Sequence, residues 1–362
     1  MKKAGLICGL LAALIVSGLA YGWQAEKVAS GLTIPWGIAY INETTLLVTE
    51  RVGTIRQVDV TTGEHQWVGE IPNVWAEGQG GLLDIAVSPF HRDQIYVTYS
   101  KNVANQGATT LARAAFRDGK ISDWQDLFVS ISETSTSRHF GSRITFDSES
   151  IYLSIGDRGV RDNGQNTQTH AGSIVRLTPD GGLPRDNPYI DNPAILDEIW
   201  SYGHRNPQGL FYDAVSQTLW SNEHGPRGGD EINLIRRGAN YGWPITSHGK
   251  EYWGPIKVGE ATEKAGIVSP VKVYIPSIAP GDLILYRGAK HPELEGKLLS
   301  SALKLMHINV VTIKKAGDET SDANAETRIL TELGERIRAL ELTPDGDLYF
   351  STDSGNLYRL ER

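Results

Sequence analysis

Two side chains in this sequence have the types expected of a base and its partner acid. His139 lies in the run Arg138-His139-Phe140-Gly141-Ser142-Arg143, and Asp157 follows at the end of the next apolar segment. A neutral histidine can accept a proton near pH 7, and a neighbouring carboxylate can fix its orientation. His139 and Asp157 are therefore candidates for proton transfer, although a surface histidine bonded to solvent is the simpler interpretation of this segment alone.

A second segment concentrates hydrogen-bond donors between glycines. It reads Gly203-His204-Arg205-Asn206-Pro207-Gln208-Gly209 and precedes an apolar run. Guanidinium and amide groups suit a carboxylate-rich ligand. A purely structural turn hardly needs three such side chains, which favours a binding role.

A third segment combines glycine and proline with hard oxygen ligands. It contains Gly225-Pro226 and Asp230-Glu231, and the segment Asn240-Tyr241-Gly242-Trp243-Pro244 follows it. Carbonyls turned outward by glycine and proline, together with carboxylates, suit calcium better than zinc or copper. A tight turn capped by acids explains the same residues equally well.

Two further segments could complete a site. The glycines around Gln79 allow close approach of a backbone to a ligand, or form an ordinary turn. Arg336 and Arg338 are two residues apart, so on a strand they face the same side. If Lys304 lies near them in the fold, several cations gather in one place. The net charge of the chain is -8, and such a cluster of like charges is costly unless an anion binds there. Each cation taken singly is equally consistent with a solvated surface.

Composition limits the class of protein. The chain has 362 residues, of which 40% are hydrophobic and 22% charged, so it can bury a sizeable core. It contains no cluster of five or more basic residues. A protein that binds the phosphate backbone gathers Lys and Arg on one face, so nucleic acid is not an expected partner.

The first 20 residues have the pattern of a secretory signal. Met1-Lys2-Lys3 precedes an apolar run that ends in small residues near Ala20. An uncleaved membrane anchor is the alternative, although the run is short for a span. Cleavage would leave a periplasmic or secreted protein with no stable membrane association. It would also remove the single cysteine, so the mature protein would have to be stabilised without disulfides.

The remaining sequence repeats a pattern of paired strands. Copies begin near residues 37, 82, 142, 209, 283 and 337, at spacings of roughly 45 to 75 residues. This predicts an all-β protein, a six-bladed β-propeller formed as one domain by residues 26–362, in which residues 26–32 supply the outer strand of the last blade. A pair of β-sandwiches is the alternative. Longer inserts at residues 180–197 and 237–276 are expected to lie over one mouth of the ring.

Together these segments resemble the soluble quinoprotein sugar dehydrogenases, a family of PQQ-dependent glucose and aldose dehydrogenases with a six-bladed propeller. The resemblance runs from about Gly31 to Leu360. The motifs that carry it occur in family order: Gly80-Gly81-Leu82-Leu83-Asp84, residues 203–209, Gly225-Pro226 with Asp230-Glu231-Ile232-Asn233, and residues 240–244.

The resemblance implies a role for each matching residue. His139 matches the general base that takes the proton of the anomeric hydroxyl while hydride passes to the quinone, Asp157 matches the acid that orients it, and Gln79 matches a residue that contacts the sugar. The other matches are the groups that bond the quinone oxygens, where negative charge develops (Arg205, Asn206), the cations that hold the cofactor carboxylates (Lys304, Arg336, Arg338), the carbonyls that bind the cofactor's calcium (Gly225, Pro226) and the ligands of a further calcium (Glu231, Tyr241).

Two positions depart from the glucose-specific members. Gly228-Gly229 replaces a more acidic stretch, and Arg138 stands where those enzymes carry an acid before the histidine. With its shorter inserts, the chain is expected to have an open mouth and to oxidise a broad range of aldoses to lactones. An external electron acceptor and a monomer or homodimer are also expected.

The alternative is a non-redox calcium-binding propeller, either a lactonase or a ligand-binding scaffold. It would use the same metal segment, but it does not explain why Lys304, Arg205 and the two arginines Arg336 and Arg338 should face one cavity.

Overall fold

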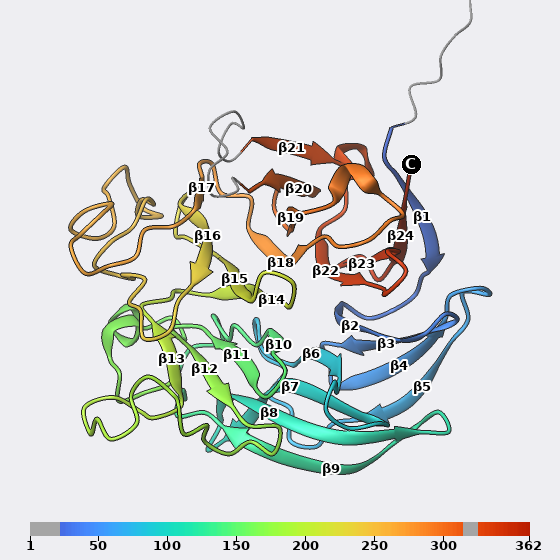
Figure 1. The fold of residues 1–362 in the computed structure, drawn as a ribbon, viewed down its shortest axis with the longest axis horizontal. Coiled ribbons are helices and arrows are strands. Elements are labelled where there is room, and N and C mark those ends of the chain that lie inside the picture. The colour runs from blue at the N-terminus through green and yellow to red at the C-terminus, as the bar shows by residue number, and fades with distance from the viewer. Residues whose placement is uncertain (1–21, 314–324) are drawn as a thin grey trace, which may run out of the picture.

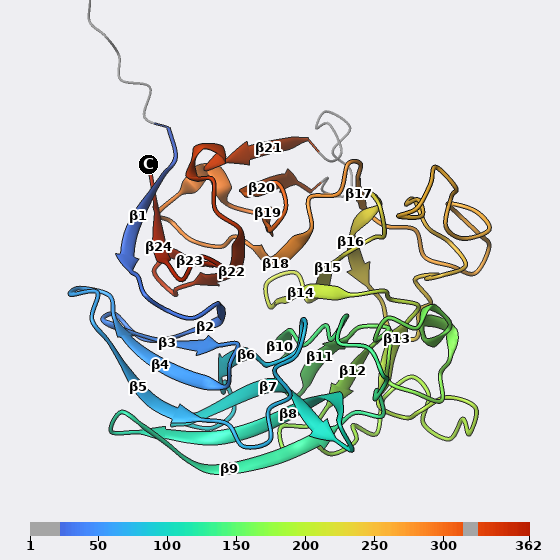
Figure 2. The same ribbon diagram turned by 180° about the vertical axis from the view of Figure 1, so that it is seen from behind.

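The computed structural model describes residues 22–313 and 325–362. Within these residues six four-stranded antiparallel sheets are arranged around a central axis (Figure 1), and the same ring is seen from behind in Figure 2. The described residues form no α-helix and only three short 3-10 helices, namely Arg161–Gln165, Pro292–Leu294 and Thr331–Leu333. The all-β six-bladed propeller is confirmed, and the alternative of two β-sandwiches is wrong.

Each blade runs from an inner strand at the axis to an outer strand. Blades 1 to 3 consist of β2 (Pro35–Asn42), β3 (Thr45–Glu50), β4 (Thr54–Asp59) and β5 (His65–Glu70); β6 (Leu82–Val87), β7 (Gln94–Val103), β8 (Gln106–Arg117) and β9 (Lys120–Val129); β10 (Ile144–Phe146), β11 (Ile151–Ile155), β12 (Ser173–Leu177) and β13 (Ile199–Tyr202). Blades 4 to 6 consist of β14 (Pro207–Asp213), β15 (Thr218–Glu223), β16 (Asp230–Ile235) and β17 (Lys272–Tyr274); β18 (Pro280–Leu285), β19 (Lys297–Ala302), β20 (His307–Thr312) and β21 (Glu326–Ile329); β22 (Ile337–Leu342), β23 (Leu348–Thr352), β24 (Leu357–Glu361) and β1 (Gln24–Ala29).

The core lies between the blades. Six hydrophobic clusters each join two neighbouring blades, and every inner strand contacts the inner strands on both sides of it. Central strands such as β11 are therefore buried on both faces and read as apolar runs rather than as alternating ones. A single blade cannot bury both of its faces, so closure of the ring is what completes the core.

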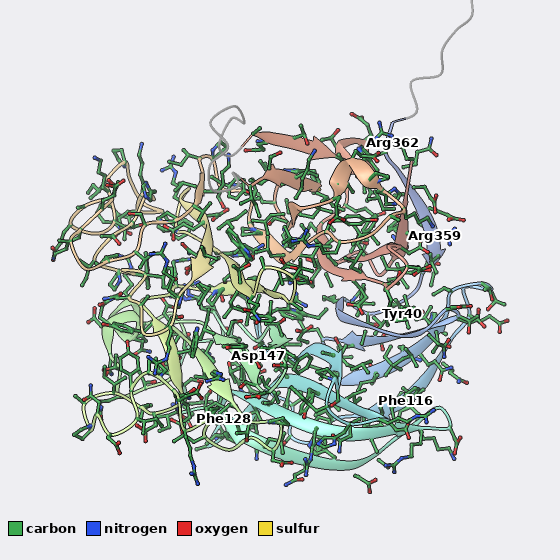
Figure 3. The ribbon with its side chains drawn as sticks, in the orientation of Figure 1. Tyr40, Phe116, Phe128, Asp147, Arg359 and Arg362 are labelled. Atoms are coloured by element: carbon green, nitrogen blue, oxygen red, sulfur yellow. The ribbon has the colours of Figure 1, made fainter. Side chains whose placement is uncertain are left out.

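The ring closes through the N-terminal strand. β1 pairs with β24 in antiparallel register, from Gln24 opposite Glu361 to Ala29 opposite Leu357, and the two strands lie side by side in both views. Arg359 of β24, labelled in Figure 3, forms an ion pair of 2.6 Å with Glu26. The predicted closure of the last blade by residues 26–32 is confirmed, with the strand starting two residues earlier.

A buried arginine ties the inner strands together at the axis. Arg143 lies just before β10, with its Nη1 2.7 Å from Asp84 Oδ1 and its Nε 3.2 Å from Asp282 Oδ1. Its guanidinium also stacks over Trp36 at 4.4 Å, and Asp282 accepts the backbone N–H of Leu340. Burial raises the pKa of Asp282 to about 7, although the charge of Arg143 opposes that rise. This cluster joins residues of blades 1, 2, 3, 5 and 6.

The two inserts differ in position. Residues 180–197 leave blade 3 next to Leu177, which pairs with Ile151 at the end of the blade opposite to His139. Residues 237–276 include β17 and also reach the mouth through Trp243. No residue of 180–197 lines either of the two cavities described below, whereas Tyr241 and Trp243 of the second insert line one of them. The expectation that both inserts lie over one mouth is therefore supported for the second insert only.

The predicted signal at residues 1–20 lies outside the described residues. Within the described part of the chain, no helix has the length and apolar character needed to cross a bilayer.

We predict that Arg143→Met lowers the free energy of unfolding by about 3 kcal/mol, because it leaves two buried carboxylates without their cation. Urea denaturation measures this change. The matched control is Arg113→Met, which removes a surface ion pair with Asp180 and should cost less than about 1 kcal/mol. Equal losses in the two variants would contradict the structural role of the axial cluster.

Candidate active site

The predicted residues gather at one mouth because of the way an antiparallel blade is wound. The connections from an outer strand to the next inner strand, and those from a second to a third strand, emerge at the same edge. The first kind of connection carries Gln79, His139, Arg205, Asn206 and Arg336. The second kind carries Asp157, Gly225, Pro226 and Lys304.

A central cavity of about 220 Å³ opens at this mouth. Four of the predicted residues line it: Gln79, Asn206, Arg336 and Arg338. Its other walls include two aromatic residues, Trp36 and Phe140, and the polar residues Gln208, His224 and Asp353. The cavity therefore combines flat apolar surfaces with cations and amides.

His139 and Asp157 form the predicted pair. His139 Nδ1 lies 2.6 Å from Asp157 Oδ1, and that oxygen also accepts the backbone N–H of Gly159 at 2.7 Å. The second carboxylate oxygen accepts Trp243 Nε1–H at 2.8 Å. The backbone N–H of His139 donates to Gln79 Oε1 at 2.8 Å. With an ionised Asp157 the imidazole proton lies on Nδ1, so Nε2 keeps the lone pair that a base needs.

Burial sets the protonation of this pair. It lowers the pKa of His139, and the hydrogen bond to Asp157 only partly offsets that effect. Burial alone would raise the pKa of Asp157, but the hydrogen bond and charge of His139 and the charge of Arg205 outweigh it, so the pKa of Asp157 falls. A neutral imidazole facing an anionic carboxylate follows, which is the resting state of a base.

One wall of the central cavity carries a cluster with more positive than negative charges. Arg336 Nε lies 2.8 Å from Asp353 Oδ2, and Arg338 Nε lies 2.5 Å from Asp353 Oδ1. One carboxylate therefore faces two guanidinium groups. Lys304 is exposed and lies beside Leu303, whose carbonyl accepts from Arg336. The excess positive charge would attract an anion to this wall. Lys304 is not among the residues that line the cavity.

The predicted metal residues line a second, smaller cavity. Gly225, Pro226, Glu231 and Tyr241 meet there with Arg205. Arg205 Nη1 donates to the Gly225 carbonyl at 2.8 Å, and its buried Nε has no hydrogen-bond partner among the described residues. The Gly225 carbonyl oxygen already binds a positively charged group, so it is a suitable ligand for a metal cation.

The donor set of the second cavity is rich in oxygen. Burial and the neighbouring Glu223 raise the pKa of Glu231 to about 8, which indicates crowded carboxyl groups that a cation would relieve. The Tyr241 hydroxyl donates to the Leu234 carbonyl and accepts from Arg236 N, so the oxygen that this residue could offer a cation is its backbone carbonyl. The described residues contain no cluster of three His, Cys, Asp or Glu that could hold a metal by side chains alone.

Gly228 and Gly229 shape this cavity. Both have left-handed φ angles, +81° and +73°, and a Cβ added at Gly225 would lie 2.2 Å from the Gly229 oxygen. The tight turn therefore requires glycines at these positions, and it holds the carbonyls of residues 225 and 226 beside the cavity.

Sequence reasoning missed three contributors to the site. Trp243 belongs to the segment of residues 240–244 that resembles the family, and it donates a hydrogen bond to Asp157 that the sequence did not predict. Asp353 lies in an ordinary turn between β23 and β24, and no local signal distinguishes it. His224 precedes the predicted Gly225-Pro226, and that adjacency was the available signal. Its Nε2 donates to the Pro280 carbonyl at 2.7 Å, and burial lowers its pKa to about 4, so His224 is neutral.

Comparison with known families matches residues 32–359 to the glucose/sorbosone dehydrogenases. The chain belongs to the glucose/sorbosone dehydrogenase family. The family predicted from the sequence motifs is thereby confirmed.

Relatives and solved structures agree with this membership. An uncharacterized protein of Synechocystis is 39% identical over 361 residues, which cover 93% of this chain and 86% of that protein. The aldose sugar dehydrogenase YliI of Escherichia coli is 37% identical over 349 residues, which cover 93% and 92%. The apo-form crystal structure of the soluble aldose sugar dehydrogenase from Escherichia coli has a TM-score of 0.86 at 35% identity and covers 93% and 98% of the two chains. The PQQ-bound aldose sugar dehydrogenase of Streptomyces coelicolor has a TM-score of 0.78 at 27% identity and covers 94% and 98%.

We predict that His139 makes this dehydrogenase less stable in acid. Because burial lowers the pKa of His139, the folded protein resists a proton that the unfolded chain binds, so stability is lost as the pH falls below about 6.5. In His139→Gln the loss of unfolding free energy between pH 7.5 and 5.5 should be smaller than in the wild type, as measured by urea denaturation.

The control is His91→Gln, which changes an exposed residue before β7 and should leave the acid-induced loss as in the wild type. The same loss in His139→Gln and in the wild type would contradict the buried, neutral imidazole.

Proposed function

We propose that the protein oxidises aldose sugars at the anomeric carbon to lactones, over a broad range of aldoses, with PQQ and calcium as cofactors. The observation that carries the proposal is the meeting of two opposed features at one mouth. His139 is bonded to Asp157 and adjoins the central cavity through two residues that line it, Gln79, which accepts its backbone N–H, and Phe140, which follows it in the chain. Arg336 and Arg338 line the same cavity and share Asp353. A neutral base therefore adjoins a cavity that carries more positive than negative charge.

The central cavity fits PQQ, which is a planar tricarboxylate. Asp353 neutralises only one of the two arginines that contact it, so a positive charge remains for a carboxylate of the cofactor. Lys304 at the rim adds a second cation. Trp36 and Phe140 supply flat apolar surface for a fused ring system.

The second cavity fits calcium. Calcium prefers carbonyl and carboxylate oxygens in a flexible set. The carbonyls of Gly225 and Pro226 would hold the calcium that binds the cofactor, and Glu231 and Tyr241, which line the same cavity, would hold a further calcium. Arg205 donates to the Gly225 carbonyl and would have to turn away for an ion to bind there, which would free its guanidinium to bond a cofactor oxygen.

The chain's own residues then divide the work. His139 Nε2 takes the proton of the anomeric hydroxyl, while Asp157 holds the imidazole and stabilises the imidazolium that forms. Gln79, which already bonds the backbone of His139, contacts the sugar, and Arg205 and Asn206 stabilise developing negative charge. When bound, PQQ accepts the hydride from the anomeric carbon, and calcium polarises its quinone carbonyl as a Lewis acid.

The setting of the enzyme is part of the proposal. Removal of residues 1–20 would leave a periplasmic or secreted protein, a monomer or homodimer, that passes electrons from the reduced cofactor to an external acceptor. A calcium-dependent lactonase or a binding scaffold would use the second cavity alone and would have no need of the arginine wall.

We predict that His139→Gln binds PQQ with the wild-type affinity but reduces it with aldose at least about 100-fold more slowly, because the base is lost. The apo-protein is titrated with PQQ and calcium by absorbance, and an aldose is then added. Rapid reduction in the variant would refute the assignment of the base. A wild-type protein that binds no PQQ at any calcium concentration would refute the cofactor, and a lactonase assay would follow.

We predict that Arg336→Ala combined with Lys304→Ala weakens PQQ binding at least about tenfold, because charge-assisted hydrogen bonds to carboxylates are lost. Fluorescence quenching of the tryptophans measures the affinity. Arg328→Ala, at an exposed ion pair with Glu326, is the control and should bind as the wild type does. Unchanged affinity in the double variant would show that the cofactor lies elsewhere.

A further inference from the structure

A buried arginine next to the candidate active site has no role in the scheme above. Arg158 follows Asp157 directly and is fully shielded from solvent. Its φ of +55° is left-handed, as is the φ of +58° at His139. Such angles are unfavourable for residues with side chains, so the surrounding contacts must hold both of them in place.

The guanidinium of Arg158 forms no ion pair with any described residue. Its Nη1 donates to Thr134 Oγ1 at 3.2 Å and its Nη2 to the Thr136 carbonyl at 3.0 Å, while its Nε has no partner among the described residues. Arg143, by comparison, is paired with two carboxylates. A buried cation without a carboxylate is costly, and proteins seldom keep one for packing alone.

Arg158 connects the base to the wall of the cavity. Its Cζ lies 3.6 Å from the centre of the Phe140 ring, and Phe140 both follows His139 and lines the central cavity. Its backbone N–H donates to the His139 carbonyl at 3.3 Å. Its own carbonyl accepts from the hydroxyls of Thr134 and Thr136. One residue therefore fastens three segments: residues 134–136, 139–140 and 157–159.

We propose that Arg158 is a positioning residue of the sugar oxidation: it locks the His139–Phe140 segment in its strained turn and supplies a fixed positive charge behind the Asp157–His139 pair. The inference rests on the proposed function. Displacement of a base by about 1 Å is enough to slow a reaction strongly. The positive charge also disfavours the protonated form of the imidazole, which keeps the base free.

The charged and titratable groups that act on this pair come from several connections. His139 is influenced by Asp157, Arg138, Arg205 and His224, and Asp157 is influenced by Arg161 as well. Arg158 itself is attracted by the carboxylates of Asp157 and Glu133. Removal of the Arg158 charge leaves Asp157 as the attracting neighbour of a protonated imidazole. The titration midpoint of His139 should therefore move to higher pH.

The test compares Arg158→Met, which removes the charge and the forked donors, with Arg158→Lys, which keeps the charge alone. Arg176→Met is the matched control, because Arg176 is also buried, stacks on an aromatic ring (Trp200) and lies in blade 3 outside both cavities. Each protein is loaded with PQQ and calcium, and aldose-driven reduction is followed by stopped flow across a range of pH. The titration of His139 in the apo-protein is followed by NMR, with His139→Gln used to assign its signal.

Arg158→Met should lower kcat at least about tenfold, with KM and PQQ affinity within about threefold of the wild type, and should raise the NMR midpoint of His139. Arg158→Lys should restore the midpoint but not the full kcat. The inference is overturned if Arg158→Met keeps the wild-type kcat and midpoint and, like Arg176→Met, loses only thermal stability. If the wild type itself fails to reduce PQQ with sugar, the proposed function fails, and the NMR midpoint still decides whether Arg158 acts on His139.

Discussion

The fold depends on one buried guanidinium at the centre of the ring. Six inner strands converge there, and two of them bring the buried carboxylates of Asp84 and Asp282 against it. Arg143 neutralises both and also donates to the Gln208 carbonyl at 3.0 Å. Because Trp36 stacks on Arg143 and lines the central cavity, this axial cluster also supports the floor of the candidate active site.

Above that floor the blades divide the chemistry by location. Blades 2 and 3 contribute the proposed base His139 and its partner Asp157, blade 4 contributes the carbonyls of the second cavity, and blade 6 contributes the arginine wall. Each element lies in a connection whose ends are fixed by strands buried in the core. A rigid support of this kind suits a site that must keep the His139–Asp157 pair and the arginine wall in fixed positions before a ligand binds.

The glycines at positions 228 and 229 and the arginine at position 138 each have a structural setting that explains the residue type. The glycines at positions 228 and 229 permit a turn in which any Cβ at Gly225 would collide with backbone. Arg138 lies against Gly159, where an added Cβ would be 2.6 Å from its Nε, so this cation packs beside the loop that follows Asp157. Arg138 directly precedes His139, whose bond to Asp157 is 2.6 Å.

The sequence by itself determined the repeat of six strand groups, the closing strand and the motifs that name the family, because strand alternation and turn residues are local signals. It also identified His139, Asp157 and the two arginines as candidates by residue type. Only the tertiary structure decided that Trp243 holds Asp157 across 86 positions, that Asp353 faces two arginines, that Lys304 stands at the rim, and that Arg158 backs Phe140. These contacts join residues from different turns, and their partners are fixed by the closure of the ring and by burial, which no local pattern encodes.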